Sequence, residues 1–171
     1  MDAAITCCFT GHRPSKLPWG EDETNPLCLW LRLELAARLQ GIYEAGYRHF
    51  ICGMAVGCDL YFAEAVLALR QRCPDLTLEA AVPCRGQEKS WSEPQQQRYR
   101  ELLAQCDSVT VLQESYSSGC MQRRNRYMVE RSSLLLACFN GSPGGTMNTI
   151  LLARRRGCRI VTIELDALLA T

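Results

Sequence analysis

The chain has 171 residues, which is enough for one compact domain with a complete hydrophobic core. Hydrophobic residues make up 47% and charged residues 22%, as is usual for globular proteins, and the formal net charge of +1 gives no electrostatic reason to expect nucleic acid or an anionic membrane as a partner. No apolar run is long enough to cross a bilayer and the N-terminus lacks the pattern of a secretory signal, so we expect a cytoplasmic protein with no membrane partner.

Strand-like and helix-like segments alternate along the chain. An apolar run ending in glycine predicts a buried strand over 3–11, and Asn25 with Pro26 begins a predicted long helix that ends at Gly46. The remaining pattern predicts strands over 49–54, 76–84, 108–114, 134–141 and 158–165, and helices over 58–73, 94–106, 119–132 and 145–157. Repeated strand–helix units require crossover connections, so the predicted fold class is α/β. We expect a Rossmann-like, doubly wound, mostly parallel sheet with helices on both faces, in a single domain over 1–171.

Open parallel sheets bind ligands outside the carboxyl ends of their strands, so the segments that follow the predicted strands are the candidate site. The first of them is Thr10-Gly11-His12-Arg13. Gly11 permits a sharp turn or a close approach to a ligand, Arg13 offers a fixed fork of donors for phosphate or carboxylate, and His12 can donate to an anion. The alternative is a surface loop with a solvated arginine.

The second segment contains Gly53, Gly57 and Asp59, before the next predicted helix. Asp59 stands where an N-cap would stand, and capping alone explains it. Capping does not explain two glycines, because one would serve for a turn. Free N–H groups at a helix start bind anions, but an aspartate would repel phosphate and suits a ribose hydroxyl or an amine better. Capping and ligand contact therefore stay open as alternatives.

The segment after the fifth predicted strand contains Pro143, Gly144, Gly145 and Thr146, which open the last predicted helix. Two glycines with free N–H groups and a neighbouring hydroxyl favour a phosphate cradle. The Gly-Lys-Thr of a Walker loop is absent. A bare glycine turn is the alternative.

Other candidates come from the third loop and from two helices. Trp91 either stacks on a base or packs structurally on the loops. The four arginines over 119–132 cannot all share one helical face, so we expect one to point into the pocket and the others to be solvated. No catalytic set stands out. Glu64, which follows Asp59 on the second helix, either faces the same cleft or is solvated.

The eleven cysteines are an unusual feature of the composition, and their number is odd. No C-x-x-C motif occurs and only two histidines are present, so a zinc site of ordinary spacing is not expected. Several cysteines lie inside apolar runs, where a thiol behaves as a small hydrophobic group. We expect reduced, mostly structural cysteines.

Four segments, "FTGHRP", "GMAVGCDLYFAEAVL", "RRNRYMVERSSLLLACFNG" and "GGT", resemble the bacterial YpsA-like family in their order and spacing. That family belongs to the SLOG superfamily, together with the Lonely Guy phosphoribohydrolases and the DprA-type proteins, and the resemblance extends over about residues 5–165. It implies a Rossmann-like domain that binds or senses a nucleotide or nucleotide-derived ligand, such as ADP-ribose or an NAD relative, with links to stress and cell-division control. The ligand-contacting positions that it implies are Gly11, Arg13, Gly53, Gly57, Asp59, Asn125, Arg126, Met128, Gly144, Gly145 and Thr146.

The chain departs from the phosphoribohydrolases in one loop. Those enzymes resemble one another in a Pro-Gly-Gly-x-Gly-Thr loop followed by glutamates, whereas this chain reads "PGGTMNT", with Met147, Asn148 and Thr149 where carboxylates are needed for proton transfer. We therefore predict a non-catalytic binder of a nucleotide-like small molecule, with no certain cofactor and no nucleic-acid partner. The alternatives are a nucleotide N-glycosidase using Asp59 or Glu64, and a scaffold whose partner is a second copy or another protein.

Overall fold

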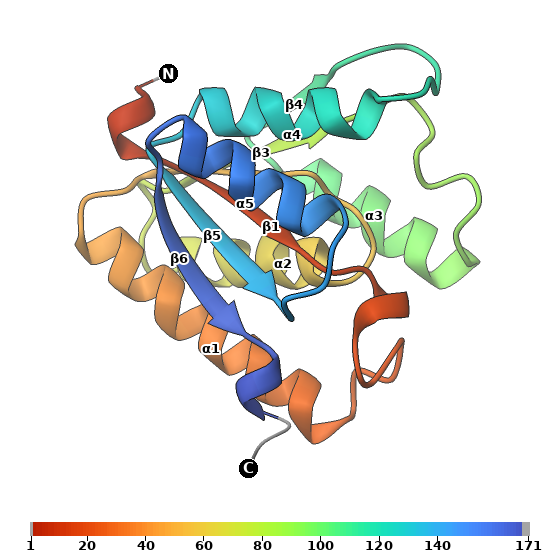
Figure 1. Ribbon diagram of the computed structural model, residues 1–171, viewed down its shortest axis with the longest axis horizontal. Helices are drawn as coiled ribbons and strands as arrows, with labels where there is room; N and C mark the ends of the chain where they lie inside the picture. The colour runs from red at the N-terminus through yellow and green to blue at the C-terminus, as the bar shows by residue number, and fades with distance from the viewer. Residues whose placement is uncertain (1, 169–171) are drawn as a thin grey trace.

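The computed structural model describes residues 2–168, which form one six-stranded sheet between two layers of helices (Figure 1). The strands are β1 (Thr6–Gly11), β2 (His49–Cys52), β3 (Thr77–Val82), β4 (Ser108–Val111), β5 (Leu134–Phe139) and β6 (Arg159–Glu164). The helices are α1 (Pro26–Glu44), α2 (Cys58–Arg70), α3 (Glu93–Gln105), α4 (Cys120–Glu130) and α5 (Gly145–Arg155), with short 3₁₀ turns at Ala3–Ile5, Pro14–Lys16 and Asp166–Leu168. The elements agree with the predicted ones, and their ends differ by a few residues.

The strand order is β4-β3-β2-β1-β5-β6, and every pairing is parallel. The chain moves outward from β1 to β4 and then returns through α4 to β5, on the other side of β1. The order therefore reverses between β1 and β5, which is where an open α/β sheet forms a crevice at its carboxyl edge. The predicted Rossmann-like, doubly wound α/β class is confirmed.

Both faces of the sheet are covered, which explains why the central strands are continuous apolar runs. On one face, α1, α2 and α3 enclose a core in which Phe9 stacks on Phe62 with their ring centroids 4.5 Å apart. On the other face, α4 and α5 pack on residues that include Cys8, Ile51 and Leu135. The helices are thus divided between the two faces, and the cleft opens where the layers meet at the ends of β1 and β5.

The cysteines belong mainly to this core. All eleven are free, eight of them are buried, and burial raises the pKa of Cys8 to about 12. Their thiols therefore pack as small hydrophobic groups, as we expected. Among residues 2–168, no helix is both long and apolar enough to cross a membrane.

Candidate ligand-binding cleft

A cavity of about 260 Å³ lies at the carboxyl end of β1, the strand paired with β5, beside the first turns of α2, α4 and α5. Segments far apart in the sequence meet there, because all of them follow or precede central strands of the sheet. The predicted site residues that line it are Thr10, Gly11, His12, Arg13, Asp59, Asn125, Met128, Gly145 and Thr146.

Two glycines allow β1 and α2 to approach each other closely. A Cβ at Gly11 would lie 2.5 Å from the Cβ of Cys58, and a Cβ at Gly57 would lie 2.8 Å from the carbonyl oxygen of His12. The Cys58 N–H donates to that same carbonyl at 3.1 Å. Gly57 also has a φ of +98°, which side-chain-bearing residues rarely adopt. These glycines shape the wall of the cleft through packing and turn geometry.

Gly53 has a different role, which is to make room for a buried arginine. A Cβ there would overlap the guanidinium of Arg124, whose Nη1 donates to the Gly53 carbonyl at 2.7 Å. The Nε of Arg124 donates to Oδ1 of Asn125 at 2.8 Å, and the side chain lines the cleft. The question of why two glycines follow β2 is thus answered by two separate close approaches.

Asp59 is not the N-cap of α2. The cap residue is Gly57, without a side-chain hydrogen bond, and Asp59 lies inside the first turn, where its Oδ2 accepts from the Ala55 N–H at 3.0 Å. The preceding loop is strained, because Met54 has a φ of +59° although it is not glycine. The loop and the carboxylate hold each other in place, and Asp59 still lines the cleft.

Asp59 and Arg124 are the buried charged groups of the cleft. Burial raises the pKa of Asp59, and the charge of Arg124 and the hydrogen bond from Ala55 act in the opposite direction. Burial likewise lowers the pKa of Arg124, which the charge of Asp59 opposes. Asp59 and Arg124 form no ion pair within 4 Å. Each charge therefore shifts the pKa of the other group without a direct contact between them.

His12 joins two segments of the cleft wall, and its predicted role as a donor to an anion stays a prediction. Its Nε2 accepts from the Asn140 N–H at 3.2 Å, and its Nδ1 lies 3.5 Å from Oγ1 of Thr146. Burial lowers the pKa of His12, and the charge of Lys16 lowers it further, so the ring is neutral near pH 7. It joins the end of β1 to the loop before α5.

The N-terminus of α5 faces the cleft without a side-chain cap. Its N-cap is Gly144, and the first-turn N–H groups of Gly145 and Thr146 precede the first intrahelical hydrogen bond. Lys16 covers this turn, because its Nζ donates to the Pro143 carbonyl at 2.6 Å and would lie 2.6 Å from a Cβ at Gly144. Sequence reasoning missed Lys16, since its position depends on the 3₁₀ turn that folds the polar loop after β1 back over the sheet.

The predicted Gly53, Gly57 and Gly144 belong to the turns around the cleft and do not line it, and three predicted side chains lie outside it altogether. Glu64 faces away because it is five residues from Asp59 on α2, and its carboxylate binds Arg98 at 2.6 Å and Arg32 at 2.9 Å. Arg126 is exposed, since the face of α4 that packs inward contains Arg124. Trp91 lies in a neighbouring cavity, where its ring meets Tyr99 edge-on at 5.3 Å.

The geometry alone allows an anion-binding cleft with one carboxylate. The YpsA family model, described as the YspA SLOG family, matches residues 7–166 of the chain. The chain belongs to this family. Among its relatives, the UPF0398 protein of Bacillus pumilus is 30% identical over 140 residues, which is 80% of this chain and 74% of that protein. The UPF0398 protein YpsA of Bacillus subtilis is 27% identical over 170 residues, 95% of this chain and 94% of that protein.

A solved structure of DNA processing protein A from Helicobacter pylori, described with its single-stranded DNA binding mode, matches with a TM-score of 0.62. The match has 15% identity and covers 94% of this chain but 65% of that one, so it shows the fold alone. Our expectation that nucleic acid is not a partner therefore stays a prediction. Family membership supports a nucleotide-related role in general.

Proposed function

We propose that this chain binds a nucleotide or nucleotide-derived ligand, such as ADP-ribose or an NAD relative, with a phosphate group at the N-terminus of α5. The observation that carries the proposal is a convergence of donors at the switch point of the sheet. Uncapped N–H groups of α5 lie in one cleft with three cationic side chains, Arg13, Lys16 and Arg124. A helix N-terminus beside cationic side chains is a favourable environment for phosphate.

Asp59 gives the proposed ligand its orientation. It is the one carboxylate that lines the cleft among residues 2–168, so it would repel a phosphate placed on its side. A carboxylate accepts hydrogen bonds, and a ribose hydroxyl is a suitable donor. The phosphate therefore lies toward Thr146 and the ribose toward Asp59.

The alternative function is hydrolysis of a nucleotide N-glycosidic bond. The observation in its favour is the raised pKa of buried Asp59, which is the property of a general acid. Glu64 cannot assist, because it is bound to two arginines outside the cleft. A single carboxyl group would then have to do all the proton transfer, and this makes binding the better-supported function.

Gly145 offers a direct test of the phosphate position. It lines the cleft, its φ is not positive, and a Cβ there would meet no atom within 4 Å, so Gly145→Asp introduces a negative charge without strain. Gly41→Asp on α1 is the matched control, since Gly41 is equally open and lies elsewhere. Ligand at 100 times its Kd stabilises a fold by about 2.7 kcal/mol, which raises the melting temperature of a domain of this size by about 5–10 °C.

We expect AMP and ADP-ribose to raise the melting temperature of the wild type and of Gly41→Asp, and to have no effect on Gly145→Asp. Adenosine, which lacks the phosphate, should bind weakly to all three. A Gly145→Asp protein that binds AMP as the wild type does would refute the phosphate position. Chromatography of the same mixtures tests the alternative: steady release of free base that Asp59→Asn abolishes would establish hydrolysis.

A further inference from the structure

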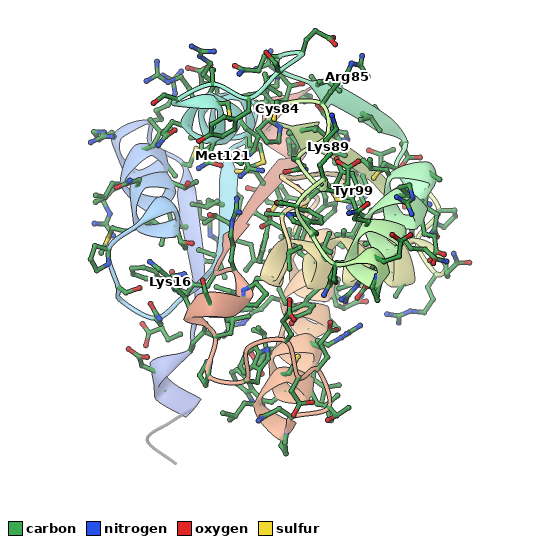
Figure 2. The ribbon with its side chains drawn as sticks, turned by 90° about the vertical axis from the view of Figure 1, so that its right-hand side faces the viewer. Lys16, Cys84, Arg85, Lys89, Tyr99 and Met121 are labelled. Carbon is green, nitrogen blue, oxygen red and sulfur yellow. The ribbon has the colours of Figure 1, made fainter. Side chains whose placement is uncertain are left out.

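A second cavity adjoins the cleft. It has a volume of about 470 Å³, and both Arg13 and Met121 line the two cavities, so their side chains form the boundary. The boundary is a soft contact, in which Nη2 of Arg13 donates to Sδ of Met121 at 3.8 Å. In Figure 2, Met121, Cys84, Arg85 and Lys89 lie in the upper part of the view, and Lys16 lies below them on the left.

The two cavities share a rigid wall. The carbonyl oxygen of Gly53 accepts from Nη1 of Arg124 at 2.7 Å on the side of the cleft and from Nε2 of Gln87 at 3.4 Å on the side of the second cavity. Gln87 also donates to the hydroxyl of Tyr99 at 3.3 Å. The hydrogen-bonded part of the wall is already in place. A ligand that occupies both cavities would therefore have to displace only the side chains of Arg13 and Met121.

The second cavity combines aromatic rings with cations. Trp91 and Tyr116 both line it, and Tyr116 has 74% of its surface exposed although it is a large aromatic residue. Lys89 has no carboxylate within ion-pair distance among the described residues, whereas Arg85 pairs with Glu114 at 2.7 Å. An exposed ring and an unpaired cation in the lining of one cavity favour a flat aromatic group carrying negative charge.

Size points in the same direction. Ligand sites for small molecules usually measure roughly 300–1,000 Å³, and the cleft alone, at about 260 Å³, falls below that range. It has room for a phosphate and a ribose but little beyond them. The adjoining 470 Å³ offers the space for a base.

Resting on the proposed function, we infer that the second cavity binds the far half of a two-part ligand, a nucleoside joined through a pyrophosphate to the group held in the cleft. The pyrophosphate passes Arg13 at the boundary, the base stacks at Tyr116 and Trp91, and Lys89 neutralises the second phosphate. The preferred class is therefore ADP-ribose or a dinucleotide, and ribose 5-phosphate alone fills only the cleft.

Titration calorimetry with ribose 5-phosphate, AMP and ADP-ribose on the same protein tests this inference. The variants are Tyr116→Ser and Lys89→Ala, since both side chains are exposed and their removal should leave the fold intact. Arg126→Ala, an exposed cation on α4 outside both cavities, is the control. Stacking of a base on an aromatic residue predicts that ADP-ribose binds the wild type at least tenfold more tightly than ribose 5-phosphate does.

In Tyr116→Ser, we expect the affinity for ADP-ribose to fall about tenfold while that for ribose 5-phosphate is unchanged. In Lys89→Ala, the affinity for ADP-ribose should fall severalfold and more steeply at low salt. Equal affinities of all three ligands for the wild type would overturn the inference and leave the proposed function standing, as would an ADP-ribose affinity that neither variant changes. Failure of every phosphate ligand to bind would instead refute the proposed function itself.

Discussion

The contact between Gly53 and Arg124 gives a sharp prediction for Gly53→Ala. The new Cβ would overlap Nη1 and lie 2.5 Å from Cζ of Arg124, while the backbone at Gly53 can accept alanine because its φ is not positive. The guanidinium is the flexible end of its side chain, so it should move rather than force the backbone apart. It then loses the 2.7 Å hydrogen bond to the Gly53 carbonyl.

The magnitude follows from two opposing terms. A hydrogen bond to a charged group contributes about 1.5–3 kcal/mol, and replacing glycine by alanine restores about 0.4–1 kcal/mol through the unfolded chain. The net loss in the free energy of unfolding is therefore about 1.5 kcal/mol. For a domain of this size that lowers the melting temperature by about 3–6 °C.

Urea denaturation of Gly53→Ala, Arg124→Met and the double variant measures the coupling directly. When Arg124 has become methionine, no guanidinium is displaced, so Gly53→Ala should cost nothing or be slightly stabilising. We expect a coupling energy of about 1.5–3 kcal/mol, because the gain from alanine is present in both backgrounds and cancels. If Gly53→Ala costs the same in both backgrounds, to within about 0.5 kcal/mol, the glycine is not there to admit the arginine and our account of this wall is wrong.

Three further predictions concern residues outside the proposed phosphate site. Gly57→Ala should destabilise the fold by more than about 2 kcal/mol, because its φ is +98° and its Cβ would lie 2.8 Å from a backbone oxygen that cannot move aside. Glu79 is buried, which raises its pKa, but hydrogen bonds from His49, Tyr127 and Thr110 lower it by more. This carboxylate therefore stabilises the fold above its unfolded pKa of about 4.3, and the contribution is lost as pH falls through the lower folded value, so Glu79→Gln should flatten the acid limb of stability against pH. Arg98→Met should cost about 1–2 kcal/mol, less in high salt, because Arg98 joins two carboxylates that tie the loop before α1 to α2.

Each of these has a control in the same chain. Gly41→Ala lies in open space within α1 and should be neutral or stabilising, so an equal loss in Gly57→Ala and Gly41→Ala would contradict the conformational argument. Glu101→Gln, on an exposed face of α3, should leave the acid limb of stability against pH unchanged. If Glu79→Gln also left this limb as steep as in the wild type, the hydrogen bonds to Glu79 would not be its cause. A loss in Arg98→Met that salt does not alter would show that packing, rather than charge, holds that loop.

The sequence by itself determined the fold class and the region of the site. Apolar runs alternating with amphipathic ones bury their apolar residues best as a parallel sheet covered on both faces, and several glycines follow strands because the chain turns or packs closely there. Residues next to central strands, such as Gly11, Asp59 and Thr146, therefore come together whatever the details of packing.

Only the tertiary structure decided which side chains of the helices and long loops face the cleft. The local sequence does not distinguish Arg124 from Arg126. The rotation of α4 against the sheet buries the first and exposes the second. Glu64 forms ion pairs with arginines of two other helices. Lys16 reaches the first turn of α5 from a loop whose sequence has no regular pattern. Such placements depend on contacts between segments far apart in the chain, and local spacing contains no information about them.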